Sequence, residues 1–415
     1  MRRAAGWTRL ALGVTLASLV VGAGACAQFP ENHLLPPPYP ARMGYRFENL
    51  RADVANTDST LVCVSFSGGG VRAGALAYGV VRRLAATRIA GGSKTLLQEV
   101  DLISAASGGA FPAAYYATFG EAAFLAEFRE RVLVRDLGMG TFWRAALCPY
   151  NLVRICSPWF NRSDLAEELY ADTIFGEHTY SDLQRRGRPF VVLNATDLAR
   201  GTRFEFTQDT FDRLGSSLAR VPVARAVAAS SAFPVLLTPV AFRDFTAAGP
   251  RYVHLIDGGV VDNLGIGHVL ETYRRGIVRS LVASGRVENL VFIVVNARNR
   301  PPDDMGDSPQ APGAIDVLSW GLSAAIDRRA DDQGELLVEL TGRTAAAASD
   351  GDTGPRVHVV EVDLDDIPDP VRRERLLSVA TTYGLEPEVI DELIDAAGEL
   401  LDRSPAFARL IDELR

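Results

Sequence analysis

Short apolar runs alternate with longer segments of helical character along most of this chain. The runs of strand character cover residues 61–67, 100–106, 189–196, 252–257, 290–297 and 356–364. Helical segments, 75–86 and 110–119, follow the first two runs. Strands that are apolar on both faces and separated by helices are typical of a parallel sheet covered on both sides. The pattern therefore predicts an α/β fold with a mostly parallel central sheet.

The C-terminal part shows helical periodicity. Asp369-Pro370 is a typical helix cap and first turn. Two stretches, 299–314 and 345–354, have the composition of mobile loops. We find no internal repeat and no break that would isolate a second core. Residues 58–300 are therefore predicted to form the core, and residues 301–415 a helical and strand extension packed on the same domain. One face of the last predicted helices carries seven apolar residues: Val389, Ile390, Leu393, Ile394, Ala397, Leu400 and Leu401.

The N-terminus has the pattern of an export signal. Three arginines precede a short apolar run, 10–21, which is too short and wrongly flanked for a membrane span. The sequence Ala23-Gly24-Ala25-Cys26 resembles a bacterial lipobox, in which the cysteine is lipidated and becomes the new N-terminus. Residues 1–25 are thus predicted to be a signal peptide. Ala23-x-Ala25 also suits ordinary signal peptidase, which would release a secreted protein.

The segment that follows, 26–57, begins with Cys26, the expected lipidation site, and contains the proline-rich stretch FPENHLLPPPYP. Proline-rich segments are extended and semi-rigid. We therefore expect this segment to be a tether that holds the protein on a membrane of the bacterial cell envelope, periplasmic or outer-membrane. Secretion is the alternative.

The composition and net charge of the chain limit the kinds of partner that it can bind. The chain of 415 residues is 47% hydrophobic, enough for a large core. Loss of the signal peptide removes three arginines and no acidic residue, so the formal net charge falls from −8 to −11. Such an acidic chain argues against nucleic acid as a partner.

Three cysteines remain after the signal peptide and Cys26. Cys63 lies in a strand pattern and is expected to be buried and inert. Cys148 and Cys156 bracket the sequence PYNLVRI and are predicted to pair in an oxidising compartment, unless a helix between them holds them apart. No second cysteine pair and no histidine cluster indicates a metal site.

The stretch ISAASGGAF places Ser107 between a predicted strand and a predicted helix. A nucleophile elbow usually reads G-x-S-x-G, and Ala105 stands where its first glycine belongs. The spacing leaves two interpretations open: a nucleophile on a sharp turn, or a small residue where a strand meets a helix. A helix that begins just after Ser107 would direct its positive dipole end at this position.

A second glycine cluster, SGGGVRAG at residues 67–74, follows the first strand and opens a helix, so its free backbone amides can hold an anion. A Walker phosphate loop is excluded because no lysine follows the last glycine. Gly68, Gly70 and Ala73 match a dinucleotide fingerprint, but the acidic residue expected about 20 positions on is missing. An oxyanion hole for a nucleophile on the next strand explains both glycine clusters.

A nucleophilic serine needs a base, and no histidine has a convincing setting. His254 and His358 lie in strand patterns, and His268 follows a loop. Asp257 ends an apolar strand and precedes two glycines, which let the backbone approach closely. Asp-Gly is also a common turn, so this feature alone is weak evidence.

Together, SGGGVRAG, AASGG around Ser107 and DGG at Asp257 resemble, in this order, the patatin-like phospholipase family. The segment AVAASSAFPVLLTPV adds to a resemblance that spans roughly residues 61–263. It implies a three-layer α/β/α fold and a catalytic core within 58–300 that hydrolyses lipid acyl esters through a Ser–Asp dyad. Ser107 would be the nucleophile and Asp257 the general base, and Arg72 would brace the glycine loop. The implied oxyanion amides are those of Gly68, Gly69, Gly70 and Gly108.

This sequence departs from the family pattern at Ala105 and Ala73, where glycine is usual. An added methyl group matters only where the backbone needs a positive φ. We expect an exported hydrolase of phospholipids, lysophospholipids or similar lipid esters that uses no cofactor, metal or nucleotide. The alternative is a non-catalytic envelope lipoprotein that binds lipid or a partner through the same cavity.

An aromatic segment, 137–160, adds a further hypothesis. Phe142, Trp143, Trp159 and Phe160 would form a lid or an acyl-chain groove. An inserted helical hairpin that packs into the core is the alternative.

Overall fold

The computed structural model describes residues 32–35, 42–52, 54–234, 236–300, 313–349 and 355–415. The predicted signal peptide and Cys26 lie outside the described residues, as do 27–31, 36–41 and 53 of the predicted tether and 301–312 and 350–354 of the two predicted loops. Of the tether residues that are described, Tyr45, Phe47 and Leu50 are buried in the main core, so this part of 26–57 is not an extended tether.

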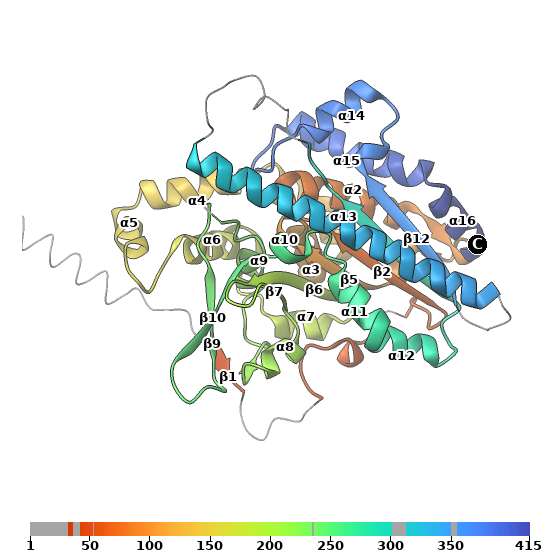
Figure 1. The fold of residues 1–415 in the computed structure, drawn as a ribbon, viewed down its shortest axis with the longest axis horizontal. Helices are drawn as coiled ribbons and strands as arrows, with labels where there is room; N and C mark the ends of the chain where they lie inside the picture. The colour runs from red at the N-terminus through yellow and green to blue at the C-terminus, as the bar shows by residue number, and fades with distance from the viewer. Residues whose placement is uncertain (1–31, 36–41, 53, 235, 301–312, 350–354) are drawn as a thin grey trace, which may run out of the picture.

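Within the described residues, one eight-stranded sheet forms the centre of the molecule, with the strand order β12-β11-β2-β5-β6-β10-β9 and with β7 paired to β6 (Figure 1). The run from β12 to β6 is parallel, whereas β7, β9 and β10 are antiparallel to their neighbours. The predicted mostly parallel sheet is therefore confirmed. Its strands are β2 (Thr60–Phe66), β5 (Val100–Ala106), β6 (Phe190–Asp197), β7 (Thr202–Glu205), β9 (Val240–Asp244), β10 (Arg251–Asp257), β11 (Asn289–Asn296) and β12 (Arg356–Asp363).

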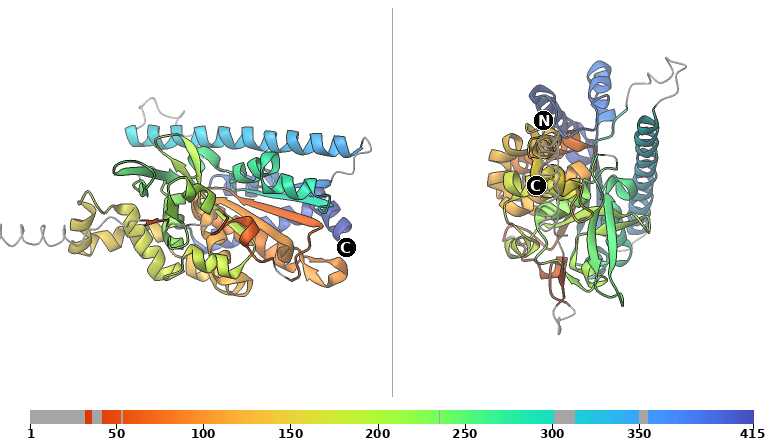
Figure 2. Two further views of the ribbon diagram at one scale, coloured as in Figure 1. Left: turned by 90° about the horizontal axis from the view of Figure 1, so that it is seen from below. Right: turned by 90° about the vertical axis from the view of Figure 1, so that its left-hand side faces the viewer.

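Helices cover both faces of this sheet and complete the predicted three-layer sandwich (Figure 2). One layer contains α2 (Gly70–Ala86), α3 (Ala110–Phe128) and α15 (Pro387–Arg403). The other contains α10 (Gly259–Asp262), α11 (Gly267–Arg275), α12 (Ile277–Ala283) and the long α13 (Ala314–Ser349). The remaining helices are α4 (Leu137–Ala146), α5 (Pro149–Ile155), α6 (Arg162–Tyr170), α7 (Tyr180–Arg186), α8 (Gln208–Asp212), α9 (Val223–Ser230), α14 (Pro370–Leu377) and α16 (Pro405–Leu414).

Two short strand pairs lie outside the central sheet. They are β1 (His33–Leu34) with β8 (Ser216–Ser217), and β3 (Arg88–Ile89) with β4 (Lys94–Thr95). Among the helices that the structure describes, none combines the length and the apolar character needed to cross a membrane.

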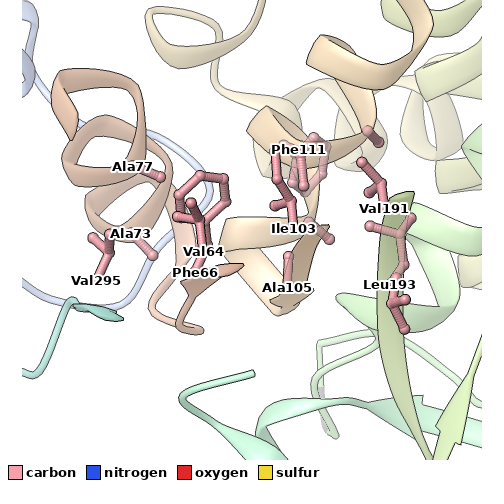
Figure 3. Packing of buried hydrophobic residues seen from close by; sticks show 14 of the residues in the cluster. Val64, Phe66, Ala73, Ala77, Ile103, Ala105, Phe111, Val191, Leu193 and Val295 are labelled. Atoms are coloured by element: carbon pink, nitrogen blue, oxygen red, sulfur yellow. The ribbon is translucent and has the colours of Figure 1, made fainter. Parts of the chain in front are cut away.

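Small residues allow α2 to approach the sheet closely. Ala73 and Ala77 lie next to Val64 and Phe66 of β2 (Figure 3). On its other side α2 meets α15, where a Cβ on Gly79 would lie 2.7 Å from Ala397 Cβ. Close packing of this kind fixes the start of α2, which carries the glycine cluster.

The C-terminal helices begin and pack largely as the pattern indicates. Asp369 caps α14 by accepting a hydrogen bond from the Val371 amide. Of the seven apolar residues predicted to share one face of α15, Val389 alone is only partly buried in the structure.

The structure corrects the loop predicted at 345–354, because residues 345–349 belong to α13. Alanine has the highest helix propensity, so the run of four alanines extends the helix. The apolar pattern does not predict α13, since few of its described side chains, among them Ile326, Ala330 and Leu337, are buried.

Candidate active site

Ser107 occupies the sharp turn between β5 and α3. It begins a short 3-10 turn, η4 (Ser107–Gly109), directly after the extended residue Ala106. Its φ of +51° is one of only two positive values among the described non-glycine residues. Such a backbone is strained for serine and is found where a nucleophile is exposed at a strand-to-helix turn. Ala105 and Ala73 have no positive φ, so the two departures from the family pattern introduce no strain.

The Ser107 hydroxyl reaches the carboxylate of Asp257. Ser107 Oγ donates a hydrogen bond of 2.7 Å to Asp257 Oδ2. The other oxygen, Asp257 Oδ1, accepts a 2.8 Å bond from the Gly259 amide. Asp257 is only 2% exposed, and burial raises its pKa to about 6, although the bonds from Ser107 and Gly259 act in the opposite direction. A carboxylate with a raised pKa is a better proton acceptor than an ordinary one.

The direction of β10 explains how Asp257 comes to lie beside Ser107. β10 runs antiparallel to β6 and overlaps it by only three residues, with Asp257 opposite Ala195. Its neighbour along β6, Asn194, lies opposite Ala106, the residue before Ser107. β10 therefore arrives from beyond the edge at which the parallel strands end, and it delivers its last residue to that edge.

Ser230, the last residue of α9, supports the serine turn. Its Oγ accepts a 3.1 Å bond from the Ser107 amide and donates a 2.6 Å bond to the Asn194 carbonyl. Its own carbonyl accepts the Gly258 amide at 3.0 Å. Ser230 thus connects the turn of Ser107 with the turn of Asp257. The sequence placed it in a segment similar to the family, but gave no signal for this role.

The glycine loop packs directly against this turn. A Cβ on Gly68 would lie 3.2 Å from Ser107 Cβ, and a Cβ on Gly108 would lie 2.6 Å from the Gly70 nitrogen. Only glycine permits this approach of two backbones. The four predicted amides are therefore gathered at one place.

These four amides are not equivalent. The Gly68 amide donates a 2.8 Å bond to the Asn263 carbonyl, so the prediction that it is an oxyanion donor is wrong in this structure. The amides of Gly69, Gly70 and Gly108 donate to no acceptor within the described part of the chain. They remain available to an anion.

Arg72 holds the glycine loop from behind. Its guanidinium is buried and donates to the Ala297 carbonyl at 3.0 Å, to Thr381 Oγ1 at 3.1 Å and to the Val379 carbonyl. The Val71 amide donates to the Thr382 carbonyl at 2.9 Å. Burial lowers the pKa of Arg72 to about 10, which leaves it charged at neutral pH.

No histidine is a partner of Ser107 or Asp257 within the described residues. His254 lies three residues before Asp257 in β10, and side chains at that spacing point to opposite faces. His268 Nδ1 lies 3.1 Å from Glu205 Oε2, and His358 Nε2 lies 3.5 Å from Glu413 Oε2.

The aromatic segment does not form the predicted four-residue lid or groove. Phe160 is 4% exposed and packs in a small separate core with Leu165. Phe142, Trp143 and Trp159 instead expose about half of their surface each. Phe160 is therefore buried while the other three aromatic side chains face solvent, so the four do not line one common surface.

The predicted disulfide between Cys148 and Cys156 is also absent. These residues are the N-cap and C-cap of α5, and both thiols are free. Eight residues of helical rise separate them by roughly 12 Å. A disulfide needs Cα atoms within about 7 Å, so the helix prevents the bond.

The described residues contain no group of three or more histidine, cysteine, aspartate or glutamate side chains placed to hold a metal ion.

The three layers, with a serine turn and a glycine-rich loop at the carboxyl edge of the sheet, define a patatin-like α/β/α fold. The model of the patatin-like phospholipase family matches residues 64–270. The chain belongs to this family, and the resemblance of its three motifs is confirmed.

Solved structures that match this chain include human GIVD cytosolic phospholipase A2, with 12% identity and a TM-score of 0.45, covering 86% of this chain and 60% of that chain. VipD from Legionella pneumophila is 14% identical with a TM-score of 0.29, covering 84% of this chain and 70% of that chain. This chain thus spans about three fifths of the human protein's chain. No curated relative matches the sequence significantly.

Proposed function

We propose that this protein is a serine acyl-ester hydrolase that acts on phospholipids, lysophospholipids or similar lipid esters. The observation that carries the proposal is the 2.7 Å hydrogen bond from Ser107 Oγ to the buried Asp257 carboxylate. Membership of the patatin-like phospholipase family supports lipid hydrolysis as the reaction.

The proposed reaction proceeds through an acyl-enzyme. Ser107 Oγ attacks the ester carbonyl carbon while its proton passes to Asp257 Oδ2. The protonated Asp257 then gives this proton to the alkoxide that leaves, and the acyl group stays on Ser107. Water repeats the sequence: Asp257 takes a proton from it, the hydroxide displaces the acyl group as a fatty acid, and Ser107 regains its proton.

The negative charge on the former carbonyl oxygen needs donors that are already in place. The amides of Gly69, Gly70 and Gly108 meet this need, because none of them is used by another described residue. One such donor is typically worth about 10²–10³ in rate. The N-terminus of α3, directly after η4, adds its dipole at the same point.

A fluorophosphonate probe tests the proposal, because it labels only an activated serine. We expect the wild-type protein to be labelled and to hydrolyse a phospholipid panel, and Ser107→Ala to do neither while remaining folded. His254→Ala, His268→Ala and His358→Ala are the controls and should retain labelling. If a folded histidine variant were as inactive as Ser107→Ala, that histidine would be part of the catalytic machinery, and the enzyme would use a triad and not a dyad. An unlabelled, inactive wild-type protein that still binds lipid would favour the non-catalytic lipoprotein.

We also propose that Cys26 is acylated and anchors the protein in the bacterial cell envelope. The lipobox-like sequence before Cys26 supports this proposal.

A further inference from the structure

The helical pair α4–α5 and the loop after it carry an unusual concentration of exposed apolar side chains. Figure 2 shows α4 and α5 (yellow) extending beyond one end of the sheet, away from the main core. Within the described residues, seven exposed large apolar side chains fall between 139 and 159: Met139, Phe142, Trp143, Leu147, Tyr150, Leu152 and Trp159. We call these seven residues the apolar face.

The apolar face is not needed to hold the helical pair together. The pair has its own small core of Phe160 and Leu165, with Ala145 and Ile155 packed against it. The Arg154 guanidinium lies 3.7 Å from the centre of the Phe160 ring and pairs with Glu168. Folding of this segment therefore relies mainly on these side chains. Of the apolar face, Tyr150 lies with its ring centre 5.3 Å from the Arg154 guanidinium and still exposes nearly half of its surface.

Charge on this segment also differs from the rest of the protein. Residues 137–163 contain three arginines and no acidic side chain, although the whole chain carries 51 Asp and Glu residues. Arg144 and Arg154 are paired with Asp172 and Glu168, which follow the segment in the chain. The segment thus contains no carboxylate of its own, and an anionic surface would not repel it.

The helical pair is connected to the candidate active site through Tyr383. The Leu137 amide, at the start of α4, donates a 3.2 Å bond to the Tyr383 carbonyl. The Tyr383 hydroxyl donates a 2.7 Å bond to the carbonyl of Ser231, the residue after Ser230, which supports Ser107. A surface bound by α4 would therefore lie next to the end of the sheet that carries the serine turn.

We infer that the apolar face docks the protein on the surface of a phospholipid bilayer. Tryptophan and tyrosine favour the boundary between head groups and acyl chains, and helices with such a face lie in that plane. A bilayer is the partner that accepts aromatic side chains and favours a segment without carboxylates. The inference deepens the proposed function and rests on it for the substrate, because docking brings lipid esters to Ser107.

Binding to vesicles of phosphatidylethanolamine and phosphatidylglycerol tests this inference. All proteins carry Cys26→Ser, which removes the acylation site and leaves Ala23-x-Ala25 for ordinary signal peptidase, so they share one N-terminus. The test variant is Phe142→Ala/Trp143→Ala/Trp159→Ala. The matched control is Val54→Ala/Leu198→Ala/Val371→Ala, which removes exposed apolar side chains elsewhere.

We expect the test variant to lose about tenfold or more in vesicle partition, because three aromatic side chains no longer leave water. The control should bind like the parent protein. Binding should persist at high salt, since Arg144 and Arg154 are already paired with carboxylates of the protein. Hydrolysis of a water-soluble short-chain ester should be unchanged in the test variant, while hydrolysis of vesicle lipid falls with binding.

Two outcomes would overturn the inference. One is equal vesicle binding by the test and control variants. The other is a parent protein that is dimeric in solution and becomes monomeric in the test variant without a change in vesicle binding, which would assign the face to a second copy. Ser107→Ala separates the two proposals, because it should abolish hydrolysis and leave vesicle binding intact.

Discussion

Asp257→Asn keeps the shape of the side chain and removes its charge, so it separates the role of Asp257 in the reaction from its effect on folding. The carboxylate is fully buried, and its pKa is raised from 3.8 to about 6. The charged form is therefore less favourable in the folded protein than in the unfolded chain. One pKa unit corresponds to about 1.4 kcal/mol, so ionisation of Asp257 lowers the free energy of unfolding by about 3 kcal/mol at neutral pH.

The sign of the pH dependence follows from the raised pKa. Below pH 3.8 the carboxyl group is protonated in both states, and its burial carries no penalty for charge. As the pH rises through 3.8 and then through about 6, that stability is lost, and above pH 6 the loss is complete. Asparagine is neutral throughout. Its oxygen can accept the Gly259 amide, and its amino group can donate to Ser107 Oγ, so both bonds seen at Asp257 have a counterpart.

Chemical denaturation of the purified protein between pH 4 and pH 8 measures this effect. We expect the free energy of unfolding of Asp257→Asn to be about 2–3 kcal/mol higher than that of the wild-type protein at pH 7. This difference should shrink towards pH 4. Ester hydrolysis should fall by about 10²–10⁴ because the general base is lost. The exposed Asp332→Asn is the control and should change neither quantity. A less stable Asp257→Asn at pH 7, or a difference that does not vary with pH, would refute this account of Asp257.

Three further predictions concern the rate, the glycine loop and the anchor. Hydrolysis of a soluble ester should rise with pH through about 6, since Asp257 must be ionised to accept a proton; at pH 5 about a tenth of the plateau rate is expected, and a flat profile would count against the dyad. Gly108→Ala should lower kcat by about 10² or more, because its Cβ would displace Gly70. Gly398→Ala, in an open part of α15, should leave the rate unchanged. Mass spectrometry of mature protein should find acyl chains on Cys26, and a soluble mature form without added lipid would contradict the anchor.

The sequence indicated the sheet and the three motifs because both depend on local constraints. A parallel strand covered on two faces is apolar along most of its length, and β2, β5, β6 and β11 are buried at every position. The glycine clusters can likewise be recognised from neighbouring residues in the sequence, since each lies at the end of a strand, where one backbone approaches another closely. Even the replacement of glycine by Ala105 did not hide the turn.

The missed features depend on contacts between distant residues. Ser230 supports a residue 123 positions away, and a serine inside an alanine-rich helix has no pattern that predicts such a bond. The Gly68 amide is occupied by the Asn263 carbonyl, which no spacing reveals. The antiparallel direction of β10 was equally hidden, because an apolar run has the same appearance in either direction.

The direction of β10 links these observations to catalysis. Running antiparallel, β10 ends beside Ala195, where the Gly258 amide binds the Ser230 carbonyl and the Ser230 hydroxyl binds the Ser107 amide. The strained φ of Ser107 and the buried charge of Asp257 both oppose folding, and both are held by this single cluster of bonds. Because each feature also favours attack by Ser107 Oγ on an ester, their combination at one point is what selection for activity at the expense of stability would produce.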